Sequence, residues 1–278
     1  MDGDDDSHAS SNHFCFSSGE IGNLTRECIL DRLKVMLHNE RTLYRYNHFS
    51  LMNSSEHQRN PMRVVPPEWR ASICKWSYNV CDYFDLSREI TSIAMSLFDR
   101  FFATKGSSAI KSNIVLLASI ATLHIAIKIR ESVIIRLETL SRFSRGNFTP
   151  EQITQMELRI LTSLGWLVNI PTSFSFVFHL LLLLPSDEID SPERNELLES
   201  SRFLAELSVA DSFFVEKPLS SRIALAAILN SLDECDTLSC GARMRYIQSI
   251  AHEVGISSQC DEVRTAQGRL RLLIRNNE

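Results

Sequence analysis

The segment IVLLASIATLHIAIKI constrains the fold more than any other stretch, and it lies inside a helical pattern at about 109–130. Its apolar residues fall on nearly every side of a helix, and a helix of this kind must be surrounded by other helices. Four more helical patterns flank it, at about 67–84, 88–104, 134–143 and 150–165. The sequence therefore predicts a bundle of five helices with 109–130 at its centre.

A second set of helical patterns follows Pro171, and no β alternation of any length appears in the chain. We therefore expect an all-α fold made of two tandem five-helix bundles. The helices of the second bundle are predicted at about 172–184, 192–209, 217–232, 240–254 and 258–275.

The chain is expected to have four parts. Residues 1–20 are mostly Ser, Asp, Gly and His, which predicts a disordered acidic tail. An N-terminal helix with its extension occupies 21–66, and this extension is expected to pack on a core. The first bundle then takes 67–170 and the second takes 171–278.

Proline and capping signals mark two helix starts. Pro67 lies at the first position of one helix, where its missing N–H costs no hydrogen bond. In the stretch TPEQ, Thr149 can cap the next helix and Gln152 completes a capping box. Both boundaries are therefore predicted from local chemistry.

Composition narrows the class of protein. A chain of 278 residues that is 44% hydrophobic can bury two cores of ordinary size. Its 29 basic and 34 acidic residues give a net charge of −5, so we expect no nucleic-acid partner and no membrane partner. Seven cysteines without a C-x-x-C pair favour an intracellular protein with no metal site. No glycine-rich phosphate loop and no G-x-S-x-G nucleophile is present, so we expect no cofactor and no catalytic residue.

Two charges lie at unfavourable ends of predicted helices. Arg70 opens the helix at 67–84 and Asp99 closes the helix at 88–104, and each opposes the helix dipole. A short connection makes these helices antiparallel neighbours, so the start of one lies beside the end of the other. We therefore predict a structural ion pair between Arg70 and Asp99.

Lys128 and Glu157 also interrupt apolar helix faces. One interpretation pairs them at the rim of the first bundle. The other makes Lys128 a helix-terminal charge that complements the dipole and Glu157 a solvated side chain. Helix statistics alone favour the second interpretation, and the sequence spacing does not overturn it.

These stretches together resemble a cyclin. WRASICKW followed by FDRFF is similar to the opening of the cyclin box, LLASIATLHIAIKIRE to its third helix and TQMELRILTSLGW to its fifth. FLAELSVADSFFVEKPLSSRIALAAI is similar to part of the C-terminal cyclin fold. The resemblance covers about residues 21–275 and rests on the order and spacing of the motifs. The cluster Tyr44-Arg45-Tyr46 and Cys74 are also similar to cyclins that are expanded in diatoms.

The resemblance implies a regulatory subunit, not an enzyme, that binds and activates a cyclin-dependent serine/threonine protein kinase and controls cell-cycle progression. Arg70 and Asp99 match the internal ion pair of the family. Lys128 and Glu157 match the residues that contact the mobile C-helix of the kinase, and Glu131 matches the second of two acids after the lysine. The family implies residence in the nucleus and the cytoplasm. The alternatives are a transcriptional or nutrient-signalling cyclin, or a cyclin-fold transcription factor or scaffold that activates no kinase.

The substrate-docking patch of many cyclins maps to Trp69, Ile73 and Trp76, and its ligands would be protein substrates or inhibitors. Asn79 stands where an acid would pair with the arginine of a substrate. We therefore expect a buried core role for Ile73. Arg130 replaces the first acid after the key lysine, a change that bears on which kinase is preferred.

Overall fold

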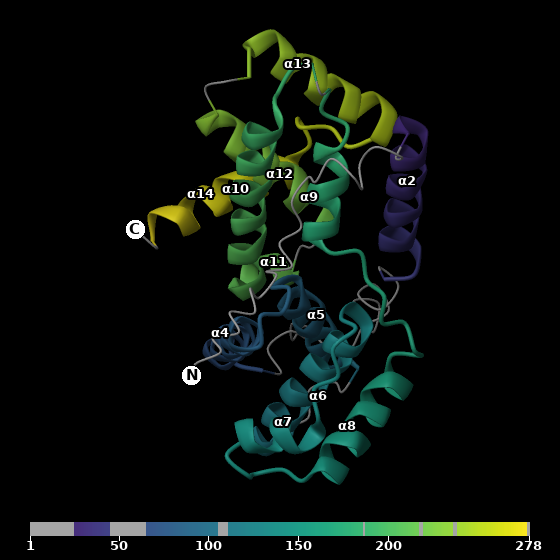
Figure 1. Cartoon of the computed structure of the whole chain (residues 1–278), viewed down its shortest axis with the longest axis vertical. Helices are drawn as coiled ribbons and strands as arrows, with labels where there is room; N and C mark the ends of the chain where they lie inside the picture. The colour runs from purple at the N-terminus through teal and green to yellow at the C-terminus, as the bar shows by residue number, and fades with distance from the viewer. Residues whose placement is uncertain are drawn as a thin grey trace, which may run out of the picture.

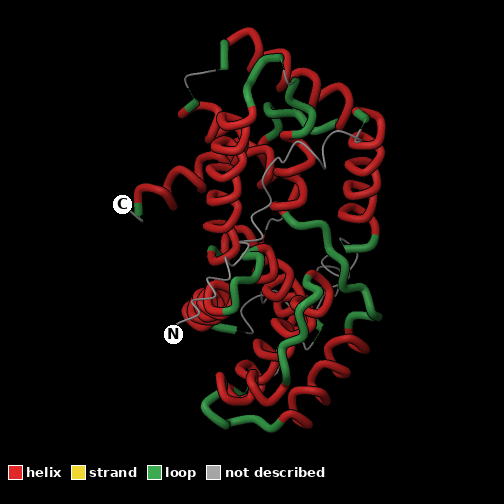
Figure 2. The backbone as a smooth tube through the Cα atoms, in the orientation of Figure 1, coloured by secondary structure: helices red, strands yellow, loops and turns green. Residues whose placement is uncertain are grey.

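The computed structural model describes residues 25–44, 65–104, 111–185, 187–216, 219–235 and 238–276. Within these ranges the chain forms helices joined by loops and turns, with no strand (Figure 1). Figure 2 shows the same division into helix and loop. The all-α prediction is confirmed. The tail predicted at 1–20 lies outside the described residues, as do Arg45 and Tyr46.

The first bundle is built around α6. It consists of α4 (Pro67–Tyr83), α5 (Glu89–Ala103), α6 (Ser112–Arg130), α7 (Leu137–Phe143) and α8 (Pro150–Ser163). Helix α6 packs against α5 and α8 and is buried at every position from Ala118 to Ile127. It is long and apolar enough to cross a bilayer, but most of it is buried inside the bundle, as expected for a core helix.

The capping box at the start of α8 forms as predicted. The Thr149 hydroxyl accepts a hydrogen bond from the Gln152 N–H at 3.4 Å, and the Gln152 side chain accepts one from the Thr149 N–H at 2.9 Å. Two N–H groups that a helix start leaves without partners are therefore satisfied by side chains.

The second bundle is built around α12. It consists of α9 (Ser173–Leu181), α10 (Ser191–Ala210), α11 (Ser212–Glu216), α12 (Ser220–Glu234), α13 (Cys240–Ser249), the π-helix η2 (Ile250–Val254) and α14 (Asp261–Arg275). Helix α12 packs against α9, α10 and α14 and is buried from Ile223 to Leu232. The short α11 was not predicted, because five residues are too few to show a helical period.

The N-terminal helix packs on the second bundle, although it precedes the first in the chain. Ile29, Leu33 and Leu37 of α2 (Arg26–Thr42) are buried in the same apolar core as α9, α12 and α14. Figure 1 shows α2 beside α9 and α13. The core of the first bundle is separate and is formed by residues between Val65 and Leu164. The sequence predicted that this N-terminal part packs on a core but did not indicate which bundle it joins.

Polar contacts fix both ends of α2. The Arg26 guanidinium donates to the Glu253 carboxylate at 2.7 Å and to the Leu183 carbonyl at 3.1 Å. At the other end the buried Glu40 carboxylate accepts hydrogen bonds from the N–H and the hydroxyl of Ser221, at 2.9 and 2.6 Å. Burial raises the pKa of Glu40 more than these hydrogen bonds lower it. The helix is thus held at each end and along its apolar stripe.

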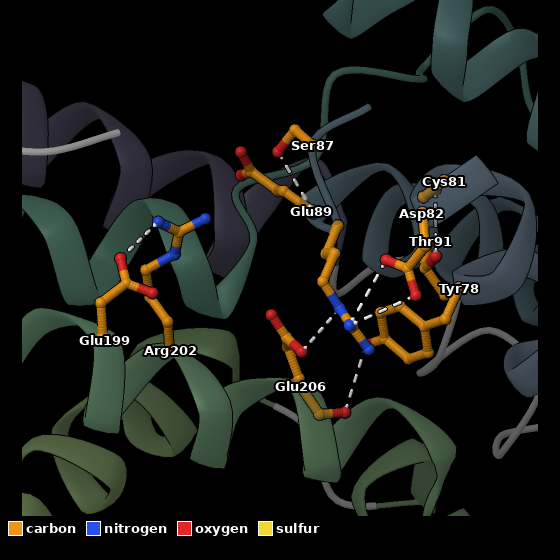
Figure 3. Close-up of polar contacts among 10 residues, drawn as sticks. Tyr78, Cys81, Asp82, Ser87, Glu89, Thr91, Glu199, Arg202 and Glu206 are labelled. Atoms are coloured by element: carbon orange, nitrogen blue, oxygen red, sulfur yellow. Dashed lines mark hydrogen bonds and ion pairs between the residues drawn. The ribbon is translucent and has the colours of Figure 1, made fainter. Parts of the chain in front are cut away.

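The two bundles meet where α4 and α5 contact α10. Figure 3 shows Glu206 of α10 on one side of this contact and Tyr78 and Asp82 of α4 on the other. The Arg88 Nε lies 2.9 Å from the Glu206 Oε2, and its guanidinium lies 4.7 Å from the centre of the Tyr78 ring. Arg88 also lies 3.4 Å from the Asp82 carboxylate. A single cation therefore links side chains of both bundles.

A buried carboxylate ties the link between the bundles to α5. Glu89 is only 5% exposed, and its Oε1 accepts hydrogen bonds from the Thr172 hydroxyl and, at 2.8 Å, from the Ser175 hydroxyl. Its Oε2 lies 2.6 Å from the Arg130 guanidinium at the end of α6. The start of α9 is therefore anchored to the first bundle through Glu89.

Candidate functional site

Lys128 and Glu157 form an ion pair at the rim of the first bundle. The Lys128 Nζ, on the last turn of α6, lies 2.8 Å from the Glu157 Oε1 in the middle of α8. The Lys128 side chain is half-exposed, whereas Glu157 is 6% exposed. The interpretation of Glu157 as a solvated glutamate is therefore wrong.

His124 is a third member of this cluster that the sequence reasoning missed. Its Nδ1 lies 2.6 Å from the same Glu157 Oε1, and the ring is buried. Burial raises the pKa of Glu157, but the hydrogen bonds from His124 and Lys128 outweigh it, so the net pKa is lowered. The carboxylate is therefore ionised at neutral pH. Because His124 and Lys128 are four residues apart on one helix, their spacing offered a signal for the shared contact.

Exposed apolar side chains lie next to this cluster in the chain. Ile129 follows Lys128 and Leu158 follows Glu157, and both side chains are exposed. Trp166, just beyond α8, is also exposed and adopts a left-handed backbone conformation with φ of 62°. These residues were not predicted as site residues. A partly buried ion pair with exposed apolar side chains next to it in the chain is the composition expected of a protein–protein contact.

The acid after the key lysine has a partner within the chain. The Glu131 carboxylate accepts a hydrogen bond from the Ser87 N–H at 3.2 Å, just before the start of α5. The neighbouring Arg130 turns to Glu89, as described above. A kinase contact by Glu131 stays a prediction, and one of its oxygens is engaged in supporting the start of α5.

Arg70 and Asp99 meet as the antiparallel arrangement of α4 and α5 predicts. The Arg70 Nε and Nη2 donate to the two Asp99 oxygens at 3.0 and 2.8 Å. The remaining Arg70 nitrogen donates to the Val209 carbonyl of α10 at 2.7 Å, a contact between bundles that the sequence did not indicate. Burial opposes the charge of Arg70, but Asp99 outweighs it and raises the pKa of the guanidinium.

The three residues mapped to a docking patch differ in exposure. Trp69 is exposed, Trp76 is partly buried against the first core, and Ile73 is buried in that core. Of these three residues, only Trp69 is exposed enough to contact a ligand. Among the described residues no group of three or more His, Cys, Asp or Glu side chains is placed to hold a metal ion.

Comparison with known proteins identifies the class. The family described as cyclin, N-terminal domain, matches residues 31–169, which is half of the chain. The chain belongs to the cyclin family, whose members are regulatory and not catalytic.

Its relatives include cyclins of the G1/S transition. The G1/S-specific cyclin-D2 of Mus musculus is 27% identical over 207 residues, which cover 71% of this chain and 68% of that protein. The G1/S-specific cyclin-E1 of Gallus gallus is 32% identical over 120 residues, which cover 43% of this chain and 28% of that protein.

Solved structures share the fold. A viral cyclin from Herpesvirus saimiri matches with a TM-score of 0.64 at 17% identity, covering 90% of this chain and 100% of that one. A chain of the CAK complex of Chaetomium thermophilum bound to ATP-gamma-S matches with a TM-score of 0.53 at 14% identity, covering 91% of this chain and 75% of that one. At these identities the structural likeness establishes the fold.

Proposed function

We propose that the chain binds and activates a cyclin-dependent serine/threonine protein kinase and thereby controls cell-cycle progression. The observation that carries the proposal is the Lys128–Glu157 ion pair, with exposed Ile129 and Leu158 beside it in the chain. Relatives named as G1/S-specific cyclins and a structural neighbour taken from a kinase complex support it.

The mechanism is activation by positioning. A protein kinase is active when the glutamate of its C-helix pairs with the lysine that holds the ATP phosphates. A partner that grips the C-helix in its inward position supplies that geometry. In this complex Lys128 would donate to backbone carbonyl groups, and Glu157 would accept from backbone N–H groups, of the C-helix and the loop next to it. Leu158 and Trp166 would bury apolar surface in an interface of about 2,000 Å² or more.

The charged pair sets orientation, and the apolar residues contribute most of the affinity. Charge complementarity across an interface chiefly improves specificity and the rate of association, whereas buried aromatic anchors contribute most of the binding free energy. Exposed Trp166 would be the aromatic anchor of this contact. Glu131 follows Lys128 by three residues and would contact the kinase beside it.

The same proposal extends to substrates and to location. Protein substrates or inhibitors would dock on α4 through Trp69, because Ile73 is buried and Trp76 is partly buried. The protein would act in the nucleus and the cytoplasm, which imaging of a fluorescent fusion in its own cells would test.

A charge reversal tests the kinase partnership. The tagged parent chain and a Lys128→Glu, Glu157→Lys double variant are precipitated from a lysate of the protein's own cells. Kinase activity on a proline-directed serine substrate is then measured in each precipitate. The double variant keeps opposite charges side by side but presents the reversed polarity to a partner, so its activity should fall at least about tenfold.

A matched control separates this effect from general damage. Arg271 and Asp233 form an exposed ion pair at 2.6 Å between α14 and α12, in the second bundle. An Arg271→Asp, Asp233→Arg variant should retain the activity of the parent. Absence of kinase activity from the parent itself would refute the proposal and would favour a scaffold or transcription factor with a cyclin fold. Equal activity from the parent and the double variant would mean that the kinase contacts another surface of the chain.

A further inference from the structure

The Glu157 carboxylate is held by two donors one helical turn apart. Both His124 and Lys128 contact its Oε1, at 2.6 and 2.8 Å. A carboxylate can accept several hydrogen bonds, and this one therefore has acceptor capacity left for a partner.

The position of a proton follows from this geometry. An ionised carboxylate has no hydrogen to donate, so the hydrogen bond requires that the His124 Nδ1 carries one. His124 is thus the donor and Glu157 the acceptor. Either the neutral ring protonated on Nδ1 or the doubly protonated ring satisfies this contact.

The two donors differ in what they can do when a partner arrives. The Lys128 side chain is half-exposed and flexible, and its three N–H groups can turn from Glu157 to a carbonyl of the partner. The His124 side chain is 7% exposed and is fixed by the surrounding core of α6. When a partner engages Lys128, His124 remains as the donor that holds the buried carboxylate in place.

We propose that His124 is a positioning residue for kinase recognition, whose Nδ1–H holds the Glu157 Oε1 so that Oε2 and the Lys128 ammonium face the kinase together. This inference rests on the proposed function. A histidine that only satisfied its own buried nitrogen would contribute to the stability of the first bundle. A positioning histidine contributes to binding through Glu157, which a mutant cycle detects.

Two variants distinguish a positioning role of His124 from a purely stabilising one. His124→Leu fills a similar volume without a donor, whereas His124→Asn places an amide N–H near the position of the imidazole Nδ1. Each variant is purified, and so is the kinase that the tagged parent chain recovers. The dissociation constant of each variant for that kinase is then measured. Loss of a hydrogen bond to a charged group should weaken the binding of His124→Leu about tenfold or more, and His124→Asn should restore most of it.

A double-mutant cycle with Glu157 tests whether His124 affects kinase binding through Glu157. In a Glu157→Ala background, His124→Leu should change the dissociation constant less than about twofold, because the group that it positions is gone. An equal loss in both backgrounds, or parent-like binding by His124→Leu, would refute the inference. The melting temperature of each variant is measured in parallel, so that affinities are compared only between variants that are folded at the temperature of the binding assay.

A measurement without the kinase distinguishes this inference from the proposed function. The titration of the Glu157 carboxyl carbon is followed by NMR in the free chain. His124→Leu should raise the pKa of Glu157 relative to the parent, and His124→Asn should leave it lowered. An unchanged Glu157 titration in His124→Leu refutes the contact itself. Failure of the parent to recover any kinase, with the titration shift present, refutes the kinase function and leaves the contact established.

Discussion

Removal of the Arg70 charge should destabilise the first bundle strongly. Arg70 donates to both Asp99 oxygens and to the Val209 carbonyl, and its side chain is 9% exposed. Arg70→Met keeps most of the side-chain length but leaves Asp99 and the carbonyl without their donor. Breaking a buried ion pair in this way costs about 3–5 kcal/mol. The Asp99 side chain is 20% exposed and regains some water, which places the expected loss near the lower figure.

The loss is measured as the change in the free energy of unfolding in urea, followed by circular dichroism. The double variant Arg70→Met, Asp99→Leu removes both charges and should recover part of the loss, because no buried charge is left without a partner. A loss below about 1 kcal/mol in Arg70→Met would refute the reasoning, since exposed ion pairs contribute no more than that. Full additivity of the two single substitutions would refute it as well.

Two further substitutions test the ends of helices. Burial raises the pKa of Glu40 in the folded chain, so the ionised side chain costs stability above that pKa and the cost is lost as the pH falls through it. The melting temperature of the parent should therefore rise relative to that of Glu40→Gln as the pH falls through that pKa towards the ordinary carboxyl value, and a constant difference across pH would contradict this. Thr149→Ala removes the capping box of α8 and should cost about 1 kcal/mol, or about 2–4 °C in melting temperature by calorimetry, while Thr149→Ser should match the parent.

Much of the secondary structure followed from the sequence because its signals are local. The capping box at Thr149 and the proline at the start of α4 fixed two boundaries to the residue. The apolar residues of α6 identified the core helix of the first bundle. Antiparallel geometry brought Arg70 and Asp99 together, because a short loop allows little else. Each of these inferences needs only neighbours in the chain.

The remaining features depend on contacts between distant segments. Ile29, Leu33 and Leu37 form the buried apolar face of α2, but either bundle would bury such a face equally well. The role of His124 was missed because a histidine in an apolar helix is usually a core residue. The sequence does not show that Glu157 of α8 lies beside it. Sequence patterns indicate which side chains are buried, but they do not indicate which distant side chains pack against them.

The attachment of α2 to the second bundle has a consequence during synthesis. The ribosome makes α2 first, yet its apolar stripe packs against α9 and η2, whose partners extend to α14 near the other end of the chain. At ~5–20 residues per second this stripe waits for tens of seconds without its native neighbours. Over that interval the first bundle can fold on its own core, while Ile29, Leu33 and Leu37 are exposed to chaperones and to other nascent chains. The apolar stripe of α2 is therefore prone to aggregation until the helices up to α14 have been synthesised and can pack.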